Sequence, residues 1–284
     1  MFKEGKVLLA TDFSKNAENL IDSLVKLKDL GIKNVLILQV LENDFGSPEA
    51  MEYAKKADKN LLENSRKKAE EIGINASITV KEGKPYKEII KTAEEENCQL
   101  ILIASHSGGV IKDILLGSNT RNIIRKSKIP VFIEKFKDKK TDEQITADSI
   151  QRILLPLDFS ESTDQVLEMI RKMSNPSEEI ILTSIIESSD DLQELNGKKE
   201  EAKKGLEKIQ NELAADNISS SYDIEVRHGD PAQNIIEIAE EKDSDLIVIS
   251  TKGKTNLKEL LIGSTAVKVA EKSPIAVLIV PVND

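Results

Sequence analysis

Short runs of apolar residues alternate along the chain with longer stretches in which apolar residues recur every three or four positions. The short runs have the length and β-branching of buried strands, and the longer spacing is typical of amphipathic helices. The expected strands of the first half are Lys6–Ala10, Val35–Leu41, Ala76–Val80, Leu100–Ala104 and Val131–Ile133. The expected helices are Ser14–Leu30 with Ser14 as N-cap, Pro48–Ile72, a helix from Pro85 to near Asn97, and most of Ile111–Ser127. Strands this apolar, separated by helices, predict a parallel sheet covered on both faces.

The second half of the chain repeats the first. Leu8–Ser14 returns 146 positions later as Leu154–Ser160, and Gly83-Lys84-Pro85 returns at the same offset as Gly229-Asp230-Pro231. The expected strands of the second half are Ile153–Leu157, Ile180–Ile186, Tyr222–Val226, Leu246–Ile249 and Ile275–Val280. The polar stretch from Lys135 to Ile150 has no apolar period and is typical of a linker. We therefore expect one domain over 1–136, a linker over 137–149 and a second copy of the domain over 150–284.

The carboxyl ends of the first and fourth strands carry the candidate chemistry. In doubly wound sheets a ligand binds beyond these ends, where the strand order reverses. This rule brings Asp12 beside Ala104–Ser118 in the first copy and Asp158 beside Ser250–Thr265 in the second. Glycine lets a backbone approach a ligand, and a helix start presents N–H groups that can bind phosphate. An acidic residue beside such a loop suggests a nucleotide, with its phosphates on the N–H groups and the carboxylate on a sugar or base donor. Alternatively, the two aspartates could cap the helices that follow them.

Composition narrows the class of protein. The 284 residues carry a formal net charge of −10 and no Trp, which argues against a nucleic-acid partner. Lys and Glu alternate along helical stretches, as on a solvated helix face. No stretch approaches about 20 uninterrupted apolar residues, so no membrane span is expected. Cys98 is the only cysteine, which fits a reducing cytoplasm, and its place before a strand suggests a half-buried structural thiol.

No catalytic or metal-binding arrangement stands out. His106 lies in the first copy's loop, where it could touch phosphate or be a surface histidine, and His228 precedes a turn. Neither has a nucleophile and an acid at a recognisable spacing, and no zinc or calcium pattern occurs. Gly253-Lys254-Thr255 resembles the end of a P-loop, but Val248 stands where that motif needs a glycine. We therefore expect no catalytic residue, no protein metal ligand and no enzyme activity.

Both halves resemble the universal stress protein family, and the resemblance covers essentially the whole chain outside the linker. The family begins with a strand that ends in a Thr-Asp-x-Ser-type turn, which ATDFS and PLDFS match in this chain. The family's Gly-x-Pro turn is matched by Gly83-Lys84-Pro85 and Gly229-Asp230-Pro231. ATP-binding members carry Gly-x2-Gly-x9-Gly followed by Ser or Thr. The second copy has Ser250-x2-Gly253-x9-Gly263-Ser264, with one glycine replaced. The first copy has Ala104-x2-Ser107-x9-Gly117-Ser118, with both leading glycines replaced.

The resemblance implies two tandem, doubly wound, Rossmann-like α/β domains, each with five parallel strands in the order 3-2-1-4-5. It implies an internal pseudo-dimer through the fifth strands, with a homodimer of the whole chain as a further alternative. It also implies that Asp12 and Asp158 meet the adenine or ribose and that Val40 and Ile185 offer backbone contacts to the adenine. The residues implied at the phosphates are Gly117 and Ser118 in the first copy and Ser250, Gly253, Gly263, Ser264 and Thr265 in the second.

The two copies differ in how well they keep this pattern. Gly253 keeps the place where a backbone must pass close to phosphate, and Ser107 adds a Cβ there. If that position needs a positive φ, serine costs roughly 1–2 kcal/mol or forces another turn. We therefore expect a cytoplasmic, nucleotide-dependent stress-response regulator that binds ATP or AMP mainly in the second copy, with Mg²⁺ as a companion of ATP. The alternative is an interaction module of the same fold that binds no nucleotide and uses its loops for a protein partner, as yet unidentified.

Overall fold

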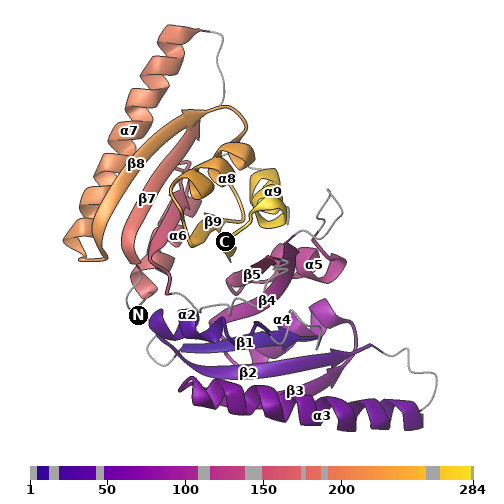
Figure 1. The fold of residues 1–284 in the computed structure, drawn as a ribbon. Helices are drawn as coiled ribbons and strands as arrows, with labels where there is room; N and C mark the ends of the chain where they lie inside the picture. Colours follow the sequence, from indigo (N-terminus) through magenta and orange to yellow (C-terminus); the bar gives the residue numbers. More distant parts are fainter. Residues whose placement is uncertain are drawn as a thin grey trace. The chain divides into compact units, whose positions relative to one another are not determined.

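The computed structural model describes residues 5–12, 19–42, 48–107, 116–137, 149–173, 177–186, 191–253 and 263–282. The chain divides between Ser149 and Ile150 into two compact units, called here domain 1 and domain 2 (Figure 1). Each domain is described by itself.

Domain 1 alternates strands and helices along the chain. Its strands are β1 (Gly5–Thr11), β2 (Ile32–Leu41), β3 (Asn75–Glu82), β4 (Leu100–Ser107) and β5 (Val131–Lys137). Its described helices are α2 (Leu24–Asp29), α3 (Pro48–Glu71), α4 (Pro85–Glu95) and α5 (Ser118–Lys126). Pro85 opens α4, as expected from its fixed φ and missing N–H.

Domain 2 repeats this order. Its strands are β6 (Arg152–Pro156), β7 (Ser177–Ile186), β8 (Ser219–His228), β9 (Leu246–Ser250) and β10 (Ala276–Val280). Its described helices are α6 (Ser162–Lys172), α7 (Leu192–Ala215), α8 (Pro231–Glu241) and α9 (Ser264–Lys272). Asp230 caps α8, where its Oδ1 accepts the backbone N–H of Gln233 at 2.9 Å. This hydrogen bond is the main cause of a lowered pKa of the Asp230 carboxyl.

The strands of each domain are parallel, and their order confirms the prediction. Domain 1 has the order β3-β2-β1-β4-β5, and domain 2 has β8-β7-β6-β9-β10. The first strand therefore lies between the second and the fourth, and the chain reverses its direction of travel across the sheet there. Right-handed crossovers then place the helices before and after this reversal on opposite faces. The long helices α3 and α7 pack on the outer two strands, and α4 packs beside α5 as α8 does beside α9.

The core of each domain consists of the central strands and the helix faces that cover them. Leu8 and Leu9 in β1 are fully buried, as are Leu154 and Leu155 at the matching places in β6. Burial on both faces explains why these strands appear as continuous apolar runs without alternation.

The first predicted helix is wrong in its extent. Among the described residues of this stretch, Asn19 and Leu24–Asp29 are α-helical, and the residues from Leu20 to Ser23 between them form turns. The reason is local: Leu24 N–H bonds to Ile21 O at 3.0 Å, a bond that spans three residues where an α-helix spans four. The apolar face is still buried, since Leu20, Ile21, Leu24 and Leu27 are at most 1% exposed. The predicted N-cap, Ser14, lies outside the described residues.

The structure also differs from the prediction at both ends of the expected linker, Lys135 to Ile150. Strand β5 runs on to Lys137, so Lys135 and Phe136 are strand residues. Residues 138–148 lie outside the described part of the chain. At the other boundary Ile150 is 6% exposed, so it is a core residue of domain 2.

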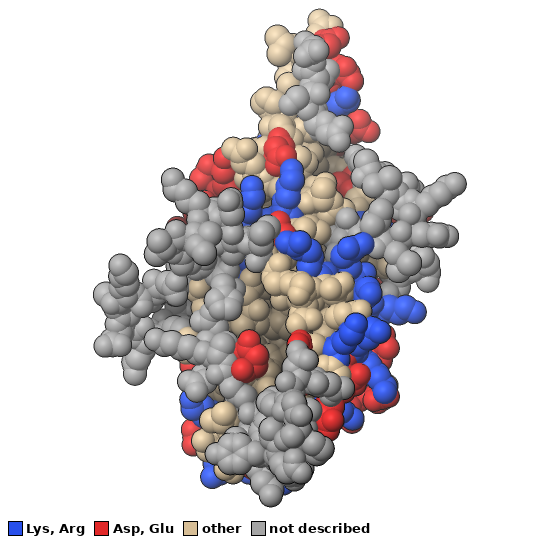
Figure 2. Space-filling view, turned by 90° about the vertical axis from the view of Figure 1, so that its right-hand side faces the viewer, with Lys and Arg blue, Asp and Glu red and all other residues tan. Residues whose placement is uncertain are grey.

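Charged residues cover the outer helix faces, as the Lys and Glu patterning predicts. Lys172 pairs with Glu168 at 2.6 Å and Lys198 pairs with Glu194 at 2.5 Å, each four residues apart on one helix. Figure 2 shows basic and acidic side chains on the same visible surface. Among the described residues, no helix is long and apolar enough to cross a membrane.

Candidate functional site

In domain 2 the chain leaves the sheet at the end of β9. The β9–β10 ladder stops at the pair Ser250 and Val280, and Pro281 follows directly. Proline has no backbone N–H, so it cannot continue a ladder. One more hydrogen bond, from Thr251 N–H to Val280 O at 2.9 Å, holds the first residue beyond the strand. Residues 251–253 are therefore outside the sheet and available to form a binding loop.

The Asp158 carboxylate, just after β6, lies directly against Gly253. An ideal Cβ on Gly253 would lie 2.7 Å from Asp158 Oδ2, closer than real Cβ atoms approach an oxygen. A side chain at position 253 would therefore require the Asp158 carboxylate or the loop to shift. The φ of Gly253 lies outside the left-handed region, so the strain considered for a serine at a position with positive φ does not arise here. The expected pairing of the first strand's aspartate with the loop after the fourth strand is confirmed for domain 2.

A chain of hydroxyl groups connects Asp158 to the same loop. Ser160 donates both its N–H and its hydroxyl to Asp158 Oδ1, at 3.0 and 2.6 Å. Ser162 Oγ then bridges Ser160 Oγ at 2.8 Å and Ser250 Oγ at 2.9 Å, and Ser250 donates to Lys252 O at 2.7 Å. Each hydroxyl has one proton, so Ser162 can donate to only one neighbour at a time. Ser250 is thus a tether for the loop in addition to being a small residue at a glycine position.

The start of α9 closes the loop on its far side. Gly263 N–H donates to Thr251 O at 2.7 Å, which ties the helix start to the end of β9. Thr251 Oγ1 in turn accepts Val282 N–H at 3.1 Å. Gly263 is the N-cap and provides no side chain to cap the first turn, in which Ser264 and Thr265 stand. The N–H groups of a helix start attract anions, and this start is partly solvent-exposed.

The remaining expected contact in domain 2 is the backbone of Ile185. It lies one residue before the end of β7, pairs with Arg227 of β8 and is half-buried. Because β7 neighbours β6, its carboxyl end reaches the same edge of the sheet as Asp158. Val40 has the matching place near the end of β2 in domain 1.

The corresponding edge of domain 1 is built differently. Strand β4 continues through Ser107, and its ladder with β5 runs on to the pair Ser107 and Lys137. Lys135 stands where domain 2 has Pro281, and it has the N–H that proline lacks. Ser107 is therefore a strand residue in domain 1, and the expectation that the fourth strand ends at Ala104 and a loop follows directly is wrong, because β4 continues for three more residues. Residues 108–115 lie outside the described part of the chain.

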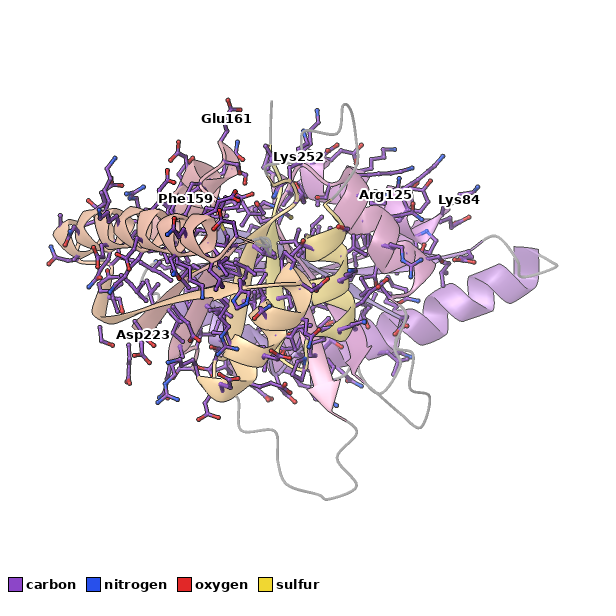
Figure 3. All side chains as sticks on the ribbon, turned by 90° about the horizontal axis from the view of Figure 1, so that it is seen from above. Lys84, Arg125, Phe159, Glu161, Asp223 and Lys252 are labelled. Carbon is purple, nitrogen blue, oxygen red and sulfur yellow. The ribbon has the colours of Figure 1, made fainter. Side chains whose placement is uncertain are left out.

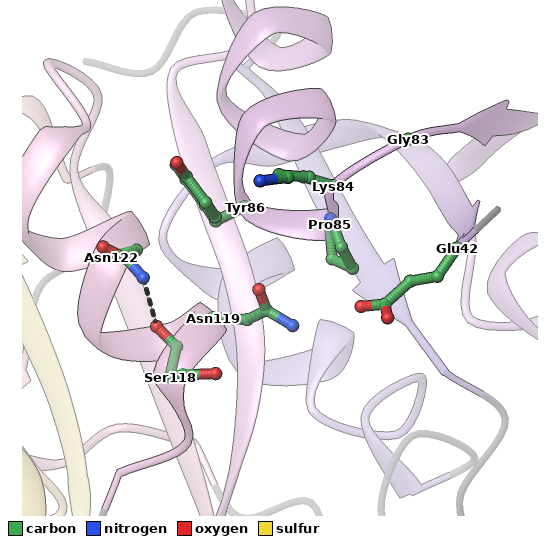
Figure 4. A pocket seen from close by; sticks show the side chains of 8 residues that line it. All are labelled: Glu42, Gly83, Lys84, Pro85, Tyr86, Ser118, Asn119 and Asn122. Atoms are coloured by element: carbon green, nitrogen blue, oxygen red, sulfur yellow. Dashed lines mark hydrogen bonds between the residues drawn. The ribbon is translucent and has the colours of Figure 1, made fainter. Parts of the chain in front are cut away.

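Domain 1 nevertheless has a cavity of about 440 Å³ at the carboxyl edge of its sheet (Figure 4). The lining residues are Glu42, Gly83, Lys84, Pro85, Tyr86, Ser118, Asn119 and Asn122. Of the domain 1 residues expected at a nucleotide, Ser118 lines this cavity, whereas Asp12, Val40 and Gly117 do not. Asn122 Nδ2 donates to Ser118 O at 2.8 Å across one turn of α5. Asp12 itself follows β1 and is exposed, in contrast to the half-buried Asp158.

Three residues of the domain 2 site did not emerge from sequence reasoning. These are Ser160 and Ser162, which form the hydroxyl chain, and Thr251, which anchors the start of α9. Ser160 belongs to the repeated Asp-Phe-Ser turn, so its link to Asp158 could have been proposed as a local side-chain turn. Nothing in the sequence brings Ser162 to Ser250, 88 positions away.

The other residues considered from the sequence have structural positions. Cys98 is 5% exposed, more buried than expected, and burial raises the pKa of its thiol to about 11. His106 lies in β4 and not in a loop, and His228 ends β8. Within the described residues, no group of three or more His, Cys, Asp or Glu side chains could hold a metal ion.

Comparison with known proteins fits this doubled architecture. The model of the universal stress protein family matches the chain twice, over residues 4–135 and 149–281. The chain belongs to the universal stress protein family. A crystal structure of a universal stress protein from Archaeoglobus fulgidus DSM 4304 superposes with a TM-score of 0.76 at 25% identity, and the match covers 98% of each chain.

Curated relatives match about one domain. A universal stress protein of Methanocaldococcus jannaschii is 31% identical over 156 residues, covering 47% of this chain and 96% of the relative. One from Methanothermobacter thermautotrophicus is 29% identical over 140 residues, covering 46% of this chain and 94% of the relative. This family member is therefore similar to two such single-domain relatives joined in tandem.

Proposed function

We propose that this universal stress protein binds an adenine nucleotide, ATP or AMP, chiefly in domain 2, and acts as a nucleotide-dependent regulator of the stress response. The observation that carries the proposal is the contact between Asp158 and Gly253 at the point where the chain leaves the sheet. It brings a carboxylate, a stretch of backbone without a side chain and the start of α9 to the same edge of the sheet. A nucleotide offers complementary groups, namely sugar or base donors for the carboxylate and phosphates for the helix start.

The donor set of this edge fits such a ligand. Asp158 would face the adenine or ribose, and the backbone of Ile185 would meet the adenine. The phosphates would be held by Gly253, Gly263, Ser264 and Thr265, with Ser250 tethering the loop. The first turn of α9 is not capped by a side chain at position 263, which favours an anion there. Mg²⁺ would accompany the phosphates of ATP, and we assign it no protein ligand.

We propose binding without turnover, because no residue is assigned the task of activating a water molecule. The proposed cytoplasmic location rests on the single cysteine. The internal pseudo-dimer, a homodimer of the whole chain and the protein partner remain predictions from the family resemblance.

Domain 1 supports a second candidate function, a nucleotide-independent interaction module. The observation that favours it is the continuation of β4 through Ser107, which keeps in the sheet the residues that form the loop start in domain 2. The cavity beside Ser118 could then receive a side chain of a protein partner. In this alternative, neither domain binds nucleotide.

One experiment separates the two candidates. The purified protein is denatured, its supernatant is analysed for adenine nucleotides by ion-exchange chromatography, and the nucleotide-free protein is titrated with ATP and AMP in a calorimeter. Co-purified nucleotide, or heat with a stoichiometry near one site per chain, would support the proposal. No nucleotide in the supernatant, together with no heat from either titration, would contradict it and leave the interaction module as the better candidate.

A further inference from the structure

Phe159 has an unusual backbone conformation for an aromatic residue. Its φ is +59°, in the left-handed region that favours glycine. The other described non-glycine residues with positive φ are Asn97, Asn217 and Asp243, which stand just after helices. Asn and Asp tolerate this region because their short polar side chains bond locally, whereas a Phe side chain gains nothing of that kind. Something outside the turn must therefore hold Phe159 in place.

The Phe159 ring lies against Gly205 in the middle of α7. An ideal Cβ on Gly205 would lie 2.6 Å from Cε1 and 2.8 Å from Cζ of the Phe159 ring. The ring therefore occupies the space that any other residue at position 205 would fill. Figure 3 shows Phe159 over the long helix α7. Glycine within a helix is unfavourable, so Gly205 lowers the stability of α7 but leaves space in which the Phe159 ring packs.

A second glycine in α7, Gly197, allows the role of Gly205 to be compared with that of a helix glycine without a neighbour. Gly197 also lies within α7, but an ideal Cβ there would meet nothing within 4 Å. The two glycines weaken the helix for the same intrinsic reason, and only Gly205 makes room for a neighbour. In domain 1 the helix at the same place, α3, contains no glycine at all. Among the described residues, this arrangement of a ring against a helix glycine is seen in domain 2; the matching Phe13 of domain 1 lies outside them.

The positive φ of Phe159 affects the orientation of the residues before and after it, Asp158 and Ser160. It turns the chain so that Ser160 N–H and Oγ point back to Asp158 Oδ1. The other carboxylate oxygen, Oδ2, then faces Gly253. We expect a change of the Phe159 φ to a negative value to reorient Ser160 and to weaken these two hydrogen bonds to Asp158.

We propose that Phe159 is a positioning residue for the domain 2 site: its ring, seated on Gly205, holds the left-handed turn that aims Asp158 at the ligand. The effect on ligand binding rests on the proposed function, whereas the effect on the turn does not. Helix α7 thereby becomes part of the support of the site, although it contributes no side chain to the expected ligand contacts.

The test compares Gly205→Ala with Gly197→Ala in the full chain. Both add the same methyl group to the same helix, and the exposed ring of Phe159 can swing away, so both variants should fold. Gly205→Ala should weaken ATP or AMP binding roughly tenfold and should speed amide hydrogen exchange at Ser160 in the nucleotide-free protein. Gly197→Ala should raise the unfolding temperature and change neither the affinity nor the exchange.

Phe159→Gly should make the turn independent of Gly205, because glycine adopts a positive φ without the support of a packed ring. Adding Gly205→Ala to Phe159→Gly should therefore change neither the affinity nor the exchange at Ser160. A Gly205→Ala variant that matches Gly197→Ala in both measurements overturns the inference, and so does a loss that Phe159→Gly fails to suppress. If the wild-type protein binds no nucleotide, the proposed function fails, and the exchange rate at Ser160 alone decides the inference.

Discussion

Asp158 and Gly253 lie so close together that an ideal Cβ on Gly253 would be 2.7 Å from the carboxylate Oδ2. The two residues are 95 positions apart and come from the ends of neighbouring strands, β6 and β9. The contact gives the retained glycine a steric role that depends on the aspartate. It also makes the domain 2 site open to direct tests.

Replacing Gly253 with Ala should weaken nucleotide binding by about tenfold, or about 1.4 kcal/mol. The added methyl displaces either the loop or the Asp158 carboxylate, which Ser160 holds by two hydrogen bonds, and overpacking typically costs about 1–3 kcal/mol. Calorimetric titration with ATP measures the change. Gly117→Ala in domain 1 is the control, because a Cβ there meets nothing within 4 Å. An unchanged affinity in Gly253→Ala would show that the loop shifts freely and that the contact does not matter for binding.

Gly263→Val should weaken nucleotide binding more than Gly117→Val. Both glycines are the N-caps of matching helices, α9 and α5, so a β-branched residue imposes a similar capping cost on each. The difference between the two dissociation constants then reports which helix start holds the phosphates. We expect about a tenfold loss for Gly263→Val and less than about a twofold loss for Gly117→Val. Equal losses would mean that the two domains contribute alike.

Ser162→Ala should lower the free energy of unfolding by about 1 kcal/mol. The substitution removes the bridge between Ser160 and Ser250 and leaves both hydroxyls short of one partner. Ser244→Ala is a matched control, since Ser244 is also a buried serine, and within the described structure its Oγ has no hydrogen-bond partner. Chemical denaturation of the three proteins compares them. Similar losses in both variants would indicate that the hydroxyl chain adds no stability of its own.

The stability of the protein should fall between about pH 9 and pH 11 because of Cys98. Burial raises the pKa of its thiol to about 11 in the folded state, above the value of about 8.5 for an unfolded chain. Below pH 8 both states keep the proton, so the group has no effect on stability there. As the pH rises the unfolded state loses the proton first, which lowers the free energy of unfolding by up to about 3 kcal/mol.

Denaturation curves of the wild type and Cys98→Ala across this pH range measure the effect. The alanine variant is expected to be less stable at neutral pH because of the cavity, but to show a shallower decline above pH 9. All other side chains are the same in both proteins, so the difference between the slopes isolates the thiol. Identical slopes would contradict the expectation.

Much of the fold could be predicted from the sequence because its signals are local or repeated. Apolar runs marked the strands, Pro85 marked the start of α4, and the constant offset between the two Asp-Phe-Ser turns revealed the duplication. The strand order followed from the family resemblance and is confirmed in both domains. The predicted ends of helices and strands were less accurate, because a single hydrogen bond can decide where an element ends. The three-residue hydrogen bond from Leu24 N–H to Ile21 O marks an interruption of the predicted helix, and Lys135 keeps β5 in the sheet.

The sequence by itself determined that two copies of one α/β domain are present, that the second keeps more of the glycine pattern, and which residues follow the central strands. Only the tertiary structure decided why position 253 is glycine, which partners Ser250 has, and why Gly205 interrupts a long helix. The physical reason is that steric exclusion and hydrogen bonding depend on atoms brought together across the sheet. A sequence pattern records that a position is small, and the folded chain shows that the Asp158 carboxylate and the Phe159 ring fill the space beside it.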